Sequence, residues 1–281
     1  MPPRKFSGPL IPGTRSVRTV NRRAKGYKKT TFRPTKAVAA YVKKEIHKNI
    51  ENKYDSLSLL PTQIPAFIGD NSTSGNIFPL MPSIGRGTAS HARIGNKLNP
   101  KSLIIKGYVT LDMADNTADY DRICIRLIAG FSKRYPLNVD MQQDIIDHPG
   151  ANWTNQLLDL GDVNGASNGT LRAHQSPVNR EVFTVKKQVF MKLSRPRFYD
   201  APLVGNDAYR YSGNSTRFFT MKIKPPKTLL YTDNGTQPMN YSPVLCAGYT
   251  LLNGATPGTP SAVTPKPLTI SFTSRLVYED A

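Results

Sequence analysis

The chain has 281 residues, and its 38 Lys and Arg against 19 Asp and Glu give a formal net charge of +19 at pH 7. Its 23 prolines argue against a mainly helical protein, because proline breaks helix interiors. Two cysteines cannot form a disulfide framework or a four-ligand zinc site, no apolar run approaches a membrane span, and the first residues lack the apolar core of a signal peptide. We therefore expect no membrane insertion, no secreted disulfide scaffold and no zinc finger, and the charge indicates a polyanionic partner.

The positive charge is concentrated at the start of the chain. Residues 1–44 hold 13 Lys and Arg and no acid, whereas the remainder carries a net charge of only +6. Residues 1–34 also contain five prolines and few large apolar side chains, so the composition predicts a disordered basic arm. We expect nucleic acid to be bound by the basic side chains of residues 1–44, which are Arg4, Lys5, Arg15, Arg18, Arg22, Arg23, Lys25, Lys28, Lys29, Arg33, Lys36, Lys43 and Lys44.

Aromatic residues are interleaved with these charges and are suited to stacking on unpaired bases: Phe6, Tyr27 and Phe32. A nuclear-import signal is a compatible second use of the same residues. A plain solubility tail is the alternative interpretation.

A helix is predicted immediately after the arm. Residues 36–51 lack Gly and Pro, carry Val38, Val42 and Ile46 at helical spacing, and follow Thr35, a favourable N-cap. Two interpretations stay open, a helix that docks on protein with its lysines toward nucleic acid and an ordinary surface helix. The predicted organisation is thus an arm (1–34), a helical segment (35–53) and a β domain (54–281).

The rest of the chain is predicted to be all-β. Segments such as 101–111, 122–131 and 268–276 alternate apolar and polar residues with period two, which is typical of strands with one face on a core. We expect about eight strands after residue 100, separated by long loops, with short helical pieces near 141–147 and 153–159. This number of strands favours a jelly roll or a similar two-sheet sandwich.

No pattern indicates catalysis. The four histidines are scattered, and the phosphate-loop, dinucleotide-binding and nucleophile-elbow motifs are absent from the sequence. Cys124 and Cys246 lie in apolar strand segments and are expected to be buried thiols. The Asp-rich turn of Asp112, Asp115, Asp119 and Asp121 fits a solvated turn better than a calcium loop. We therefore expect no enzyme activity, no cofactor and no metal.

Three segments of the β region resemble a known group of proteins. Gly85–Leu111 reads GRGTASHARIGNKLNPKSLIIKGYVTL, in which the matching positions are Gly87, Arg93, Ile94, Gly95, Asn96, Lys97, Lys101 and Ser102. This element resembles the one that leads into the first sheet strand of capsid proteins from circovirus-like, circular Rep-encoding single-stranded DNA (CRESS-DNA) viruses. Pro177–Leu193 and Ser271–Asp280 resemble the middle and last strands of the same group.

The resemblance implies a single eight-stranded viral jelly roll that self-assembles into an icosahedral shell of about 60 copies. The basic arms would package a single-stranded DNA genome through sequence-independent contacts, with Arg93 and Lys97 as hypothetical helpers on the inner surface. The loops 61–100, 132–180 and 194–215, including Val204–Thr216, are candidates for subunit contacts and for recognition of a host receptor. The implied location is the virion, and the host nucleus during assembly.

Two other functions fit the same residues. A jelly-roll capsid protein of a small RNA virus would carry a similar arm, because the arm charges suit either polymer. A cellular nucleic-acid-binding β-sandwich protein would bind through the same tail without forming a shell.

Overall fold

The structure is a computed structural model that describes residues 35–49, 52–66, 68, 76–111, 122–148, 151–161, 163–194, 214–252 and 268–280. The chain divides into two compact units, Met1–Ile50 and Glu51–Ala281. The first unit contains the helix α2 (Lys36–Asn49), close to the predicted range. Thr35 caps it as predicted, because its side-chain Oγ1 accepts a hydrogen bond from the backbone N–H of Val38 at 3.4 Å.

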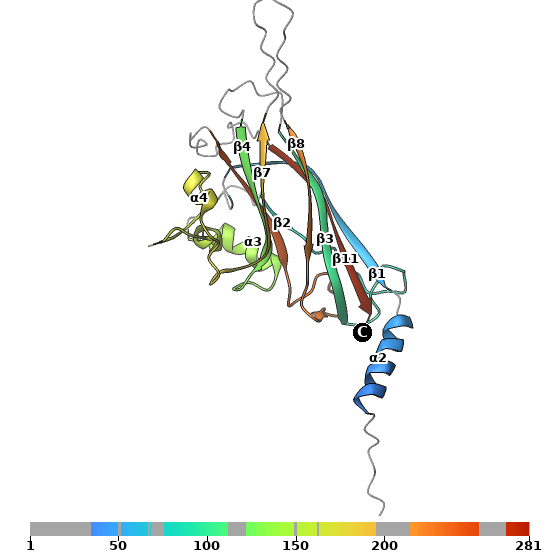
Figure 1. The fold of residues 1–281 in the computed structure, drawn as a ribbon. Coiled ribbons are helices and arrows are strands. Elements are labelled where there is room, and N and C mark those ends of the chain that lie inside the picture. The colour runs from blue at the N-terminus through green and yellow to red at the C-terminus, as the bar shows by residue number, and fades with distance from the viewer. Residues whose placement is uncertain are drawn as a thin grey trace, which may run out of the picture. The chain divides into compact units, whose positions relative to one another are not determined.

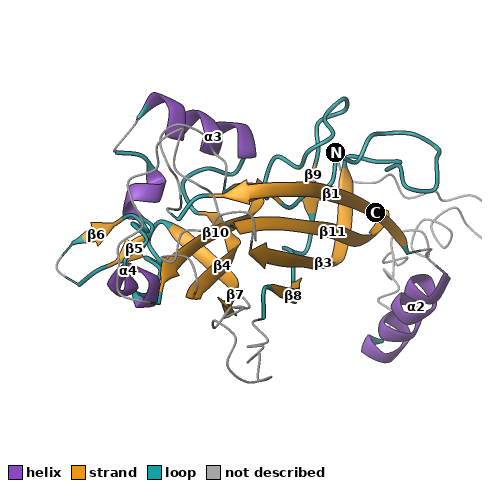
Figure 2. Ribbon diagram, turned by 90° about the horizontal axis from the view of Figure 1, so that it is seen from above, coloured by secondary structure: helices purple, strands orange, loops and turns teal. Residues whose placement is uncertain are grey.

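The second unit is an all-β sandwich of two antiparallel sheets, as the alternating pattern predicted. The larger sheet has the order β1–β11–β3–β8, with β9 also paired to β3 (Figures 1 and 2). Its strands are β1 (Lys53–Ile64), β3 (Lys97–Leu111), β8 (Thr216–Ile223), β9 (Leu229–Leu230) and β11 (Leu268–Asp280). We call it the five-stranded sheet.

The second sheet has the order β2–β10–β4–β7 and is called the four-stranded sheet. Its strands are β2 (Ile77–Pro79), β4 (Arg122–Ser132), β7 (Phe183–Ser194) and β10 (Pro243–Leu251). The segment between β4 and β7 contains α3 (Asn138–Asp147), the 3₁₀ turn η2 (Trp153–Gln156), β5 (Leu158–Asp159), β6 (Asn164–Gly165) and α4 (Leu171–Gln175). Figure 1 places α3 and α4 beside the four-stranded sheet, on the side away from the five-stranded sheet.

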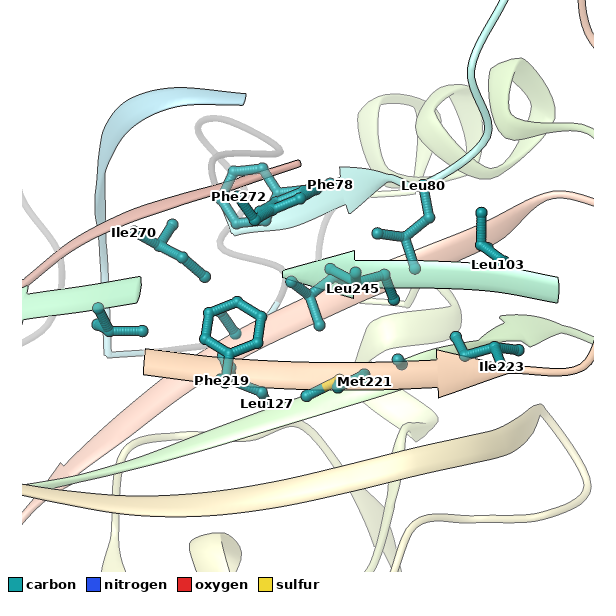
Figure 3. Close-up of a cluster of buried hydrophobic side chains, with 14 of the residues drawn as sticks. Phe78, Leu80, Leu103, Leu127, Phe219, Met221, Ile223, Leu245, Ile270 and Phe272 are labelled. Carbon is teal, nitrogen blue, oxygen red and sulfur yellow. The ribbon is translucent and has the colours of Figure 1, made fainter. Parts of the chain in front are cut away.

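The main core lies between the two sheets. Figure 3 shows Phe78, Leu127 and Leu245 from the four-stranded sheet facing Phe219 and Phe272 from the five-stranded sheet. Within β3 the buried apolar alternation is interrupted at Gly107, where a Cβ atom would lie 2.9 Å from the Phe219 ring and closer still to β11. The core is therefore packed so closely that this strand position requires glycine.

A second cluster of buried residues covers the outer face of the four-stranded sheet. Ile128 and Cys246 on that face pack with Met141 of α3 and Trp153 of η2. The Trp153 ring stacks on Phe183 with centroids 5.7 Å apart. The predicted loop 132–180 is thus largely a folded cover, and its short helices lie near the two predicted positions, with α4 in addition.

One expectation about the strands is wrong. Strands β1 and β2 both precede residue 97, although all strands were placed after residue 100. The sequence of β1 contains Asp55 and Pro61, residue types that are depleted in strands. An edge strand tolerates Pro61 because the register with β11 shifts between Leu59 and Thr62. The segment 180–193 is compatible in sequence with one long strand or two, and the structure forms the single strand β7 there.

Candidate nucleic-acid interface

Most of the predicted nucleic-acid-binding residues lie outside the described residues. This holds for Arg4, Lys5, Arg15, Arg18, Arg22, Arg23, Lys25, Lys28, Lys29 and Arg33. Lys36 is exposed in the first turn of α2, and Lys43 and Lys44 follow on the same helix. Their role therefore stays a prediction. The basic segment, residues 1–44, is joined by the chain to β1, the edge strand of the five-stranded sheet.

The outer face of the five-stranded sheet carries a set of exposed cations. On β3, β8 and β11 the side chains of Lys106, Lys222 and Arg275 alternate with buried core residues, so they point away from the core. Lys106 lies opposite Thr220 of β8 and Thr273 of β11, and Ile104, two residues earlier, lies opposite Lys222 and Arg275. The three charges therefore occupy two adjacent rows across the sheet.

None of the exposed residues in β1, β3, β8 and β11 is acidic. The acids in these strands are less accessible, and two of them are neutralised by neighbours. Asp280 pairs with Lys53 at 2.6 Å between Oδ2 and Nζ, and Glu279 pairs with Lys101 at 2.5 Å. The exposed surface of the sheet is consequently positive, which favours an anionic partner.

Aromatic rings lie on the same face. Tyr108 pairs across strands with Phe218, and the two rings meet edge to face with centroids 6.2 Å apart. The Phe218 side chain is 81% exposed, the highest value among the described large apolar residues. At the β1 edge, the Arg275 guanidinium lies 3.8 Å from the centroid of the half-exposed Tyr54 ring. Exposed rings beside cations are the features of surfaces that bind single-stranded nucleic acid.

Arg93, expected as a helper on the inner surface of a shell, is instead fully buried. Its guanidinium donates hydrogen bonds to the carbonyl oxygens of Thr232 (2.6 Å), Gly235 (2.8 Å) and Gly95 (2.7 Å), and it lies over the Tyr231 ring. It also bonds the Asn96 side chain and the Asp233 carbonyl. Arg93 therefore clamps two loops together and has no surface left for a genome. Lys97, at the start of β3, is exposed.

Arg126 is the second buried cation. It points from β4 toward the cover, donates to the carbonyl oxygens of Ala173 (3.1 Å) and His174 (3.0 Å), and lies over the Phe190 ring. Burial lowers the pKa of Arg126 to about 10. Burial, together with the nearby Arg126 charge, lowers the pKa of His174 to about 4. His174 is therefore neutral at pH 7, and its buried ring is part of the packing between the cover and the four-stranded sheet.

The described residues contain no group of three or more His, Cys, Asp or Glu side chains that could hold a metal ion. The Asp112, Asp115, Asp119 and Asp121 cluster lies outside the described residues. Both cysteines are buried free thiols, as predicted. Burial raises the pKa of Cys246 to about 12 and raises that of Cys124, so neither thiol is activated as a nucleophile.

No family model matches the chain, and no curated protein matches it. Among the described helices, none combines the length and apolar character needed to cross a membrane. The sheet face must therefore be interpreted from its own residues.

The sequence pattern placed part of this face correctly. Alternation in β3 put Lys106, Tyr108 and Thr110 on the polar side, and alternation in β8 left Phe218 and Lys222 opposite the core set. Tyr54 was missed because β1 was not predicted. The pairing of β3 with β8 places Tyr108 beside Phe218. Periodicity cannot predict this contact, because it joins residues far apart in the chain.

Proposed function

We propose that this protein is a viral capsid protein that self-assembles into a closed shell and packages single-stranded DNA through its basic segment. The observation that carries the proposal is the combination of a concentrated basic segment with a two-sheet sandwich of particular strand order. In this proposal the sandwich is a jelly roll, the architecture found in viral capsid domains.

The strand order supports the jelly roll. Along the chain, β1 belongs to the five-stranded sheet, β2 to the four-stranded sheet and β3 to the five-stranded sheet again. Strands β4 and β7 follow in the four-stranded sheet, and β8, β10 and β11 alternate between the two sheets. The orders β1–β11–β3–β8 and β2–β10–β4–β7 make chain-distant strands neighbours in both sheets. This supports a winding of eight principal strands as two Greek keys.

The charge distribution supports packaging. The 13 positive charges of residues 1–44 have no acidic residue among them that could pair with them. They are therefore available to neutralise phosphates. Such contacts release counterions and read no base sequence, which suits a protein that must hold a whole genome. Sequence-independent binding of this kind is expected to weaken steeply with salt.

The first test is negative-stain electron microscopy of the full chain after nuclease treatment, with the ratio of absorbance at 260 and 280 nm recorded on the same fraction. Uniform small spheres that protect nucleic acid are expected. A persistent monomer or dimer, across salt and pH and with added single-stranded DNA, would overturn the proposal in favour of a cellular nucleic-acid-binding protein. Sequencing the protected polymer separates a DNA-packaging shell from an RNA-packaging one.

A second test assigns the binding to the basic segment. Replacing Arg22, Arg23, Lys25, Lys28 and Lys29 by Gln keeps the length of the segment and removes five charges. We expect less protected nucleic acid and a shallower dependence of binding on salt, since each lost phosphate contact lowers the slope by about 0.7 for a single strand. The matched control replaces Lys133, Arg134, Lys186, Lys187 and Lys192 by Gln; these residues are exposed on β7 or just after β4, in the region of the four-stranded sheet. An equal loss in both variants would contradict the assignment.

A further inference from the structure

We infer that the outer face of the five-stranded sheet is a second binding surface for single-stranded nucleic acid. In this inference Tyr108 and Phe218 stack on unpaired bases, while Lys106, Lys222 and Arg275 bind the adjoining phosphates. The inference rests on the proposed function, because it names a further site for the same polymer. The two sites differ in chemistry, since the basic segment supplies mainly charge, whereas the sheet face supplies charge and exposed aromatic rings.

The register places the two kinds of side chain within reach of one strand of nucleic acid. Tyr108 and Phe218 form one row across β3 and β8, and Lys106 lies two residues away on β3. Lys106 belongs to the second row, and the third row contains Lys222 and Arg275 on either side of Ile104. Successive rows on one sheet face are separated by about 6.6 Å, twice the rise per residue. An extended strand can therefore place bases on the rings and its phosphates beside the cations.

The exposed ring of Phe218 offers a surface on which a base can stack. A phenyl ring that is 81% exposed on a sheet, with one edge against Tyr108, leaves a ring face open to solvent. Every base has a π-face, so stacking on such a ring tolerates any sequence. The neighbours Thr220 and Thr273 are also exposed and offer hydroxyl groups that donate hydrogen bonds to phosphate or sugar oxygens.

Charge distinguishes this partner from a second protein subunit. The cores of protein–protein interfaces are depleted of lysine, whereas Lys106 lies in the middle of this face, beside the central strand β11. The exposed residues of the four main strands include no carboxylate that could pair with it. At the edge, the Arg275 guanidinium lies over the Tyr54 ring, and no ion pair joins it to a carboxylate of the described residues. A polyanion with aromatic bases complements both features at once.

The experiment uses a fluorescent reporter within the proposed site. Phe218→Trp keeps an aromatic ring there, and the natural Trp153 is fully buried within the cover, so the new indole supplies the exposed signal. Full-length, unassembled subunits are titrated with an oligothymidine of about 20 nucleotides, a length that exceeds the site size of typical stacking surfaces. Fluorescein on the oligonucleotide reports total binding by anisotropy in the same samples. We expect the tryptophan emission to be quenched in step with binding.

The control reporter is Val139→Trp. Val139 is 73% exposed on α3, on the cover of the other sheet, so an indole there should keep its emission when oligothymidine binds. Binding without quenching at position 218, or equal quenching at both positions, would overturn the inference and leave the proposed function intact. Failure of the oligonucleotide to bind at all would instead remove the proposed function together with the inference.

Affinity measurements separate stacking from simple apolar contact. Phe218→Leu keeps an apolar side chain without a π-face, and we expect it to weaken oligothymidine binding about 5- to 100-fold relative to Phe218→Trp. Lys106→Gln with Lys222→Gln should lower the salt slope by about 1.4, whereas Lys192→Gln, on an edge strand of the four-stranded sheet, should leave it unchanged. Shell formation lost with unchanged oligonucleotide affinity would show instead that the face is a contact between subunits.

Discussion

The two sheets of the sandwich enclose the same core and yet meet their surroundings differently. Within the four-stranded sheet, β4 is almost entirely buried and all nine residues of β10 are buried, because the segment between β4 and β7 folds back over them. The edge strand β7 keeps Lys186, Lys187 and Lys192 exposed. The five-stranded sheet is buried on its inner face only, and its outer face carries Lys106, Phe218 and Arg275. An alternating sequence pattern therefore predicts that a strand has one face on the core. Whether its other face is exposed depends on the segment between β4 and β7, which covers one sheet and not the other.

The largest expected difference between the two faces concerns their aromatic residues. Trp153→Ala removes a fully buried ring that stacks on Phe183 and donates from its Nε1 to the Met141 carbonyl. We expect a loss of about 3–5 kcal/mol in the free energy of unfolding, measured by urea denaturation of the full chain. Phe218→Ala, on the open face, should change it by less than about 0.5 kcal/mol. Equal losses would mean that the open face is covered in solution.

Two arginines extend the comparison from rings to charges. Arg93→Lys replaces a planar group that bonds five acceptors by a group with three donors, so at least two acceptors lose a charged partner. We expect a loss of about 3 kcal/mol. Arg275→Lys, on the open face, is the matched control and should cost little, because solvent replaces what the side chain loses. A tolerated Arg93→Lys would show that the loop 231–235 does not depend on this clamp.

The sequence predicted the open face better than the covered one. Lysine and threonine at alternate positions of β3 and β8 correctly indicated the solvent-facing side. The uncharged sequence of β10 is typical of a strand that is buried on both faces. Arg126 was misleading, because it has the spacing of a solvent-facing residue in β4 but lies under α4. Nothing in a single sequence reports that Ala173 and His174, nearly 50 residues away, supply carbonyl groups for its charge.

Arg93 and Lys97, the two basic residues expected on the inner surface of a shell, also show that local sequence does not predict which charge is buried. Arg93 and Lys97 are four residues apart and equally basic, so charge alone gave both the same hypothetical role. The structure separates them through the chain-distant loop that contains Thr232 and Gly235, which encloses Arg93 and leaves Lys97 exposed. Burial of a charge depends on acceptors brought from elsewhere in the fold, and local sequence carries no record of them.

The cover should also make the stability of the protein sensitive to acid. His174 has its pKa lowered to about 4 in the folded protein, whereas an unfolded chain binds the proton near pH 6.5. The unfolded state therefore holds more protons between these values, so stability is lost as the pH falls from about 6.5 toward 4. At pH 5 the loss from this residue is about 2 kcal/mol. His174→Gln should flatten the dependence of unfolding free energy on pH, and parallel pH profiles for the two proteins would contradict this.

The smallest expected signal is the reactivity of the two thiols, which reports whether the cover opens on its own. Cys246 lies beneath the cover with its pKa raised to about 12, and Cys124 lies nearer the end of the same sheet. We expect neither to react appreciably with a disulfide reagent at pH 8 in the native protein. In Trp153→Ala, Cys246 should react well before global unfolding, since the packing that closes the cover is weakened, whereas in Phe218→Ala it should stay protected. Equal protection in both variants would mean that the cover and the sandwich open only together, and the difference between the two sheets would then be one of burial and not of local stability.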